Sequence, residues 1–100
     1  MTENGLSAID NVQLDGRVCD PYRIDYLARY IGAAHDAVSQ GVPLKGYFVW
    51  AFLDNFEWNT GYYNQFGLVY VDRKTQKRIL KDSAFWYRDV ARANGLSQKE

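Results

Sequence analysis

Two glutamates and a group of aromatic side chains carry the most informative chemistry in this chain of 100 residues. Glu3 precedes the turn-forming pair Asn4-Gly5, so it falls where a strand would give way to a loop. Glu57 follows an apolar segment that contains Trp50. A carboxylate accepts two hydroxyl hydrogen bonds, and an indole offers an apolar face and one N–H donor. An aromatic platform beside a carboxylate is the chemistry of sugar binding.

The candidate sugar-binding group is Trp50, Asp54, Asn55, Glu57 and Trp58, with Phe66 farther along the chain. Each candidate also has an ordinary structural explanation. Trp50 fits a hydrophobic core, and Glu57 fits a solvated surface, because charged residues are mostly exposed. Glu3 likewise fits a solvated glutamate near a chain end. The pattern alone leaves both interpretations open.

Composition excludes several other function classes. Twelve basic residues balance twelve acidic ones, which argues against a nucleic-acid or anionic-membrane partner. The longest apolar run, residues 46–53, is far shorter than a membrane span. Cys19 and His35 are the sole residues of their types, so we predict no disulfide, metal or cofactor. The chain starts without a secretory signal pattern, and a cytoplasmic location is the expectation.

The elements that must position these residues follow from periodicity and from turn signals. Asp20 and Pro21 are suited to open a helix, and Gly41 and Pro43 are suited to end it. Apolar residues recur between them at helical spacing, namely Ile24, Leu27, Ile31, Ala34 and Val38. The pattern therefore predicts a helix over residues 21–40.

The second half of the chain reads as a strand, a long loop, a hairpin and a helix. Residues 45–53 are apolar on both faces, which is typical of a strand buried on both sides. A loop over 54–65, a short strand over 68–71, a polar turn over 72–78 and a return pairing at Ile79-Leu80 follow. A last helix is expected over 83–93, with a cap near Asp82, Gly95 at its end and a buried face of Ala84, Tyr87, Val90 and Ala91.

The order predicts one α/β domain over residues 1–100, built as strand, helix, strand, helix. Two parallel strands cannot bury both their faces and their edges. Such a unit therefore normally belongs to a larger sheet or barrel.

Three motifs make the chain resemble the C-terminal end of family-one glycoside hydrolases, the β-glucosidase and 6-phospho-β-glucosidase group. Residues 2–5, Thr-Glu-Asn-Gly, resemble the family's nucleophile motif. Residues 46–58 are similar to its eighth barrel strand and sugar-binding loop. Residues 66–72 and 81–87 are similar to the segments that follow. The resemblance implies the last quarter of a (β/α)₈ TIM barrel: the end of strand seven, helix seven, strand eight and helix eight.

The resemblance also implies roles for individual residues. It implies that Glu3 is the catalytic nucleophile, that Trp50 lies under the sugar, that Glu57 and Trp58 bind its distal hydroxyls, and that Phe66 forms an aromatic wall. The subgroup that accepts phosphorylated sugars has serine where Glu57 stands, so Glu57 implies an unphosphorylated glucoside as the substrate.

The implied reaction is retaining hydrolysis of a terminal β-glucoside, with two carboxyl groups roughly 5 Å apart. The family's acid/base glutamate lies in an Asn-Glu-Pro motif, which this sequence lacks. We therefore expect a fragment that is inactive alone and that is partnered by a missing N-terminal barrel portion. Two alternatives stay open, a barrel-completing assembly piece and a non-catalytic sugar-binding module.

Overall fold

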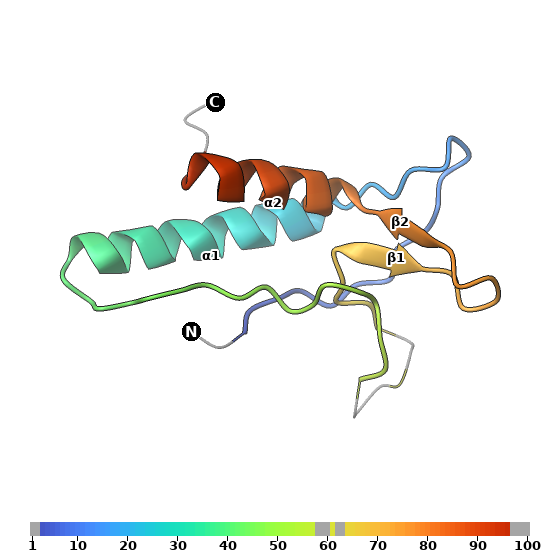
Figure 1. The fold of residues 1–100 in the computed structure, drawn as a ribbon, viewed down its shortest axis with the longest axis horizontal. Helices are drawn as coiled ribbons and strands as arrows, with labels where there is room; N and C mark the ends of the chain where they lie inside the picture. The colour runs from blue at the N-terminus through green and yellow to red at the C-terminus, as the bar shows by residue number, and fades with distance from the viewer. Residues whose placement is uncertain (1–2, 58–60, 62–63, 97–100) are drawn as a thin grey trace.

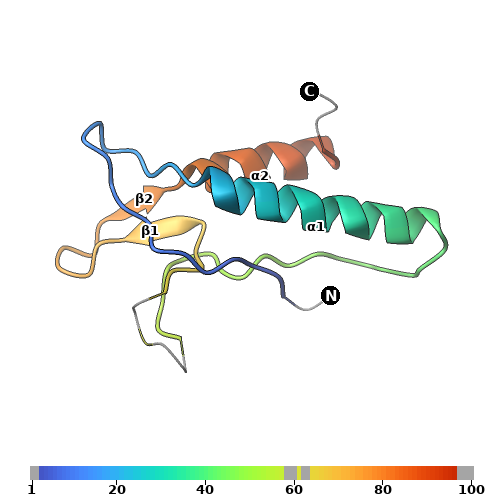
Figure 2. The same ribbon diagram turned by 180° about the vertical axis from the view of Figure 1, so that it is seen from behind.

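The computed structural model describes residues 3–57, 61 and 64–96. Along the chain it contains α1 (Pro21–Ser39), β1 (Val69–Val71), β2 (Arg78–Leu80) and α2 (Asp82–Ala93). The two helices lie side by side, and both views show extended segments running along α1 with the β1–β2 hairpin at one end (Figures 1 and 2). The helices thus form one layer, which covers the extended segments from one side.

The predicted first helix is confirmed as α1. Pro21 occupies its first turn, and Leu27 is fully buried on the face toward the rest of the molecule. Gly41 follows the helix with φ +96°, a conformation that glycine adopts without steric penalty. Val38, the last residue of the predicted apolar stripe, is 50% exposed, because the end of α1 extends beyond the packed part of the described structure.

Asp20 does not cap α1 through its side chain, contrary to the prediction. Its carboxylate instead accepts hydrogen bonds from the backbone N–H of Ser83 (2.8 Å) and from the Ser83 hydroxyl (2.6 Å), in the first turn of α2. Arg23 also donates to it at 2.6 Å. The residue that precedes one helix therefore stabilises the start of the other, and this contact ties the two helices together.

The predicted hairpin and last helix are confirmed, with two corrections. Val69 pairs with Leu80 in an antiparallel register, and α2 starts at Asp82. The residue that ends α2 is Asn94, in the left-handed conformation (φ 53°), where the prediction placed Gly95 at the end. Ala91, predicted on the buried face, is exposed, because it lines an open hollow between α2 and α1.

The predicted strand over 45–53 is wrong as a regular strand. Its described backbone makes isolated parallel bridges, Asn4 with Val49 and Leu53 with Val69, rather than a continuous ladder. Burial alternates along it: Ala51 is 4% exposed, whereas Phe48 and Phe52 are 64% and 71% exposed. The segment is apolar on both faces, but other described residues cover only the face that contains Ala51. The face that contains Phe48 and Phe52 is exposed.

The apolar core of the described residues is small, and charged side chains share it. The buried apolar residues are Val18, Leu27, Ala51, Leu68, Val69 and Val71. The largest fully buried side chains are those of Arg23 and Lys81. Neither described helix has the length and apolar character needed to cross a membrane.

Candidate active site

The segment that contains Glu3 runs beside the segment that contains Trp50. The N–H of Asn4 donates to the carbonyl of Phe48 at 3.0 Å, and the N–H of Trp50 donates to the carbonyl of Asn4 at 2.8 Å. Gly5 permits this approach, because a Cβ atom there would overlap the carbonyl oxygen of Trp50. Residues about 45 positions apart in sequence are thereby fixed as neighbours, and Glu3 is exposed next to the junction.

Trp50 and Glu57 are in direct contact. The indole N–H of Trp50 donates to a carboxylate oxygen of Glu57 at 3.2 Å. Trp50 is 38% exposed, so part of its ring system remains accessible. The carbonyl of Phe66 accepts from the N–H of Ala51 at 2.9 Å, which places Phe66 beside the segment that contains Trp50. An aromatic platform and a carboxylate acceptor thus lie together, as sugar binding requires.

The structure thus places the segments of Glu3, Trp50 and Phe66 side by side through backbone hydrogen bonds, and a side-chain contact joins Glu57 to Trp50. Trp58, the remaining predicted sugar-binding residue, lies outside the described residues. In the described part of the chain, no group of three or more potential metal ligands converges. The chemistry available from the described residues is that of carboxylates, amides and aromatic rings.

A buried network of charges holds the base of the loop that carries Glu57. Lys81 donates to Asp54 at 2.8 Å and to Asp10 at 2.7 Å, and both members of each pair have almost no solvent exposure. The same carboxyl group of Asp54 accepts from the N–H of Gly67 at 2.9 Å and from the side chain of Gln65 at 3.1 Å. The Asp54 carboxylate, which stands at the start of the loop over 55–66, therefore also holds the end of that loop through hydrogen bonds.

The network continues to α1 through Arg23, which pairs with Asp10 at 3.0 Å and with Asp20 at 2.6 Å. Three carboxylates face two cations, and the positive end of α2 adds to their neutralisation through its contact with Asp20. The sequence pattern predicted Asp54 as a sugar-binding residue and Asp20 as a helix cap, and it predicted no role for Asp10 or Lys81. Their spacing of 71 positions leaves no local pattern to detect.

Acidification is expected to weaken this network. Burial by itself would raise the pKa of the Asp10 carboxyl, but hydrogen bonds from Lys81, Tyr22 and Arg23 outweigh it and hold that pKa below its ordinary value. A carboxyl whose pKa is lower in the folded than in the unfolded protein stabilises the folded state. This stabilisation is complete above the pKa of the unfolded state, about 3.9, and is lost as the pH falls through the pKa of the folded state. We expect Tm to drop below about pH 4 for this reason.

Thermal melts from pH 7 to pH 2 measure this effect. An Asp10→Asn variant should have a lower Tm at neutral pH and a flatter acid dependence than the wild type. The exposed Asp25→Asn variant is the matched control, and its acid dependence should follow that of the wild type. Parallel acid profiles for Asp10→Asn and wild type would contradict the role given to Asp10.

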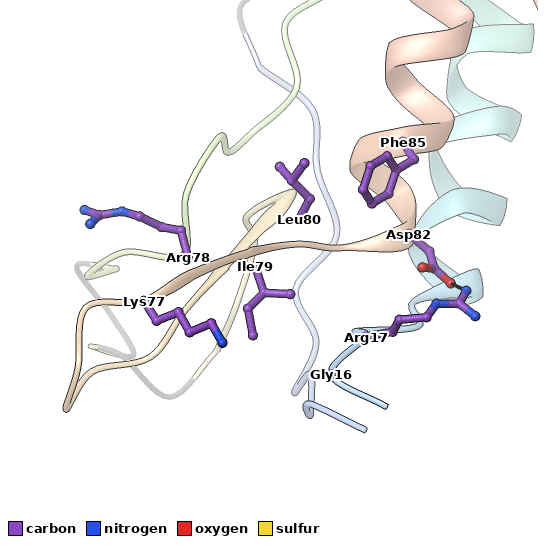
Figure 3. Close-up of a pocket in the computed structure, with 8 residues that line it drawn as sticks. All are labelled: Gly16, Arg17, Lys77, Arg78, Ile79, Leu80, Asp82 and Phe85. Carbon is purple, nitrogen blue, oxygen red and sulfur yellow. Dashed lines mark hydrogen bonds and ion pairs between the residues drawn. The ribbon is translucent and has the colours of Figure 1, made fainter. Parts of the chain in front are cut away.

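A hollow of about 800 Å³ lies apart from these contacts, and none of the predicted site residues lines it. Apolar side chains of Ile79, Leu80 and Phe85 line it, and Arg17 at its edge pairs with Asp82 at 2.9 Å. In the close-up of this hollow, the guanidinium groups of Arg17 and Arg78 point in opposite directions (Figure 3). Its cations do not converge, so the hollow is not built to hold an anion.

Comparison with known proteins gives a consistent match. The model of glycosyl hydrolase family 1 matches residues 1–96. β-Glucosidase A of Thermotoga maritima is 60% identical over 96 residues, which are 96% of this chain and 22% of that protein. A 6-phospho-β-galactosidase of Streptococcus equi subsp. zooepidemicus is 45% identical over 97 residues, which are 97% of this chain and 20% of that protein.

A solved structure gives the same result for the fold. The β-glucosidase from Thermotoga maritima in complex with castanospermine superposes with a TM-score of 0.96 at 59% identity, over 98% of this chain and 22% of that one. The chain therefore spans about a fifth of the length of the relatives it matches.

Proposed function

The chain belongs to glycosyl hydrolase family 1, and from that premise we propose that it is the C-terminal quarter of a (β/α)₈ barrel enzyme. In this proposal Glu3 stands at the end of strand seven, α1 is helix seven and α2 is helix eight. Residues 46–53 take the position of strand eight, where the complete barrel would pair them along their length. The parallel bridge between Asn4 and Val49, with helices on one side only, supports this arrangement.

The exposed face of residues 46–53 supports a missing remainder of the barrel. Phe48, Trp50 and Phe52 present large apolar surfaces that a soluble protein normally covers. A groove of about 520 Å³ lies between this segment and α2, and its lining is mostly apolar. The proposed N-terminal barrel portion would pair with the free edge of this segment and cover Phe48 and Phe52.

We propose that the complete enzyme hydrolyses terminal β-glucosides with retention of configuration. Glu3 attacks the anomeric carbon and forms a covalent glycosyl-enzyme, while the bond to the aglycone breaks and the acid/base carboxyl protonates the departing oxygen. The same group then takes a proton from water, which hydrolyses the glycosyl-enzyme and releases the sugar and Glu3. Trp50, Glu57, Trp58 and Phe66 hold the sugar, and the acid/base carboxyl comes from the missing portion. The observation that carries the proposal is the backbone junction that sets Glu3 beside Trp50, whose indole N–H reaches Glu57.

We propose an unphosphorylated sugar as the substrate, on the basis of Glu57. An anionic carboxylate repels a sugar 6-phosphate at close range, and it binds hydroxyl groups well. The similarity to a 6-phospho-β-galactosidase shows that fold alone does not decide this preference. The side chain at position 57 is therefore the residue to test.

The Glu57→Ser variant of the complete enzyme is expected to lose about 10²-fold in kcat/KM for p-nitrophenyl β-D-glucoside, because hydrogen bonds to a charged acceptor contribute roughly 1.5–3 kcal/mol. Its kcat/KM for the 6-phosphate of the same glucoside should rise relative to wild type. The exposed Asp25→Asn variant should leave both values unchanged. A wild type that prefers the 6-phosphate would overturn the proposed substrate.

The chain alone is expected to be inactive and to associate through its bare apolar face. Purified as 100 residues, it should show no turnover of p-nitrophenyl β-D-glucoside above the buffer rate, since it lacks the acid/base group. Sedimentation velocity should show self-association that the double variant Phe48→Ser/Phe52→Ser reduces. Turnover by the pure monomeric chain would contradict the fragment proposal.

A further inference from the structure

Asn4 makes several hydrogen bonds to other protein groups, and a role in sugar binding would not require them. Its side-chain oxygen accepts from the Tyr47 hydroxyl, and its side-chain nitrogen donates to the Tyr26 hydroxyl at 3.2 Å. Its backbone N–H and carbonyl pair with Phe48 and Trp50, at 3.0 and 2.8 Å. All four polar groups of one residue are therefore bonded, and their partners lie on α1 and on the segment over 46–53.

This residue is the immediate neighbour of Glu3. In extended backbone, successive side chains point to opposite faces. The Asn4 side chain reaches Tyr26 on α1, so it faces the helix layer, and Glu3, which is exposed, faces away from it. The directions of the two side chains are therefore coupled: a rotation of the backbone at Asn4 would also change the direction in which the Glu3 side chain points.

We propose that Asn4, gripped by the hydroxyls of Tyr26 and Tyr47, is a positioning residue that fixes the direction of the Glu3 carboxylate. The inference rests on the proposed function, because it assigns Glu3 the nucleophilic role. Attack on the anomeric carbon needs near-linear approach, and small misplacements of a reacting group lower the rate strongly. The two hydrogen bonds between Asn4 and these tyrosines, called the grip, affect Glu3 through the backbone, and none of the three residues contacts the substrate.

The environment of these contacts keeps the Tyr47 hydroxyl protonated, so that it can donate to Asn4. Burial, together with neighbouring tyrosines, raises the pKa of Tyr47 to about 12. Burial likewise raises the pKa of Tyr26, whose ring stacks on Tyr30 with centroids 4.4 Å apart. The stack holds the Tyr26 ring in place, so the hydroxyl is presented to Asn4 at a defined position.

The test uses the complete enzyme with Tyr26→Phe, Tyr47→Phe and the double variant. Each single variant should lower kcat about tenfold, with KM and the inhibition constant of isofagomine within about twofold of wild type. The double variant should lose little more than either single one, because both hydroxyls hold the same amide. All rates are taken per titrated active site and well below Tm, so that loss of folded protein does not contribute.

Tyr87→Phe is the matched control. Tyr87 is half-buried on α2, near Tyr47, and its kcat should stay within about twofold of wild type. Unchanged kcat in both Tyr26→Phe and Tyr47→Phe, with an active wild type, would overturn the positioning role while the proposed function survives.

A second measurement does not depend on turnover. The side-chain amide signals of Asn4, in asparagine-labelled protein, should exchange slowly with solvent in the wild type and faster in each tyrosine variant. Equal exchange in wild type and variants overturns the grip. A wild type without glucosidase activity counts against the proposed function, and the amide signals then still decide whether Asn4 is held.

Discussion

The Glu3→Gln variant of the complete enzyme is expected to lose at least about 10⁴-fold in kcat, because the reaction then has no nucleophile to form the glycosyl-enzyme. Glutamine keeps the shape of the side chain and removes its charge. Because Glu3 is exposed, this change leaves the buried contacts intact. Steady-state hydrolysis of p-nitrophenyl β-D-glucoside measures the loss.

The Glu3→Gly variant provides the complementary result. Azide should enter the space left by the side chain and restore turnover, with a glucosyl azide of inverted configuration as product. The same azide should not accelerate Glu57→Gln, whose loss comes from sugar binding. A Glu3→Gln enzyme within about tenfold of wild type would rule out Glu3 as the nucleophile and would favour the non-catalytic sugar-binding alternative for this segment.

The second large expected effect is on stability. Lys81→Met should lower the free energy of unfolding by about 3–5 kcal/mol, because it leaves Asp10 and Asp54 buried without their cation. Methionine has a similar length, so the change removes the charge more than the volume. Urea denaturation of the purified protein, followed by circular dichroism, measures the difference.

Two further variants separate charge from packing. Adding Asp54→Asn to Lys81→Met should recover part of the loss, since fewer uncompensated charges remain. Lys77→Met, at an exposed lysine near the same hairpin, should change stability by no more than about 0.5 kcal/mol. Equal effects at positions 77 and 81 would contradict the importance of the buried network.

Local sequence signals predicted the regular elements well. Pro21 and Gly41 bracket α1 closely, since proline and glycine act on the backbone of their own neighbourhood. The hairpin of β1 and β2 is also local, with a short polar turn between its strands. These elements need few distant contacts, so their residues specify them directly.

The elements that depend on distant partners were predicted less well. Residues 45–53 have the composition of a strand covered on both sides, but a regular strand also needs neighbours that pair along its length. The buried pairing of Lys81 with Asp10 joins residues far apart in sequence, and no periodicity announces it. Asp20 was predicted to cap its own helix, but its carboxylate accepts hydrogen bonds from Ser83 instead.

The candidate site was predicted from the sequence in part: the residue types were predicted, but the contacts that hold them were not. Sequence patterns pointed to Glu3, Trp50 and Glu57 as types suited to sugar chemistry, and the structure brings their segments together. The contacts that hold them, those of Asn4 with two tyrosines and of Asp54 with the loop ends, come from the fold. The catalytic and binding roles themselves stay predictions.

Covalent trapping of the complete enzyme tests the central claim most directly. 2,4-Dinitrophenyl 2-deoxy-2-fluoro-β-D-glucoside forms a glycosyl-enzyme that hydrolyses slowly, so the labelled residue can be identified by peptide mass spectrometry. We predict one sugar per polypeptide, attached to Glu3 and absent from the Glu3→Gln variant. A label on Glu57 or on any other residue, in an enzyme that hydrolyses β-glucosides, would contradict the assignment of Glu3 as the nucleophile.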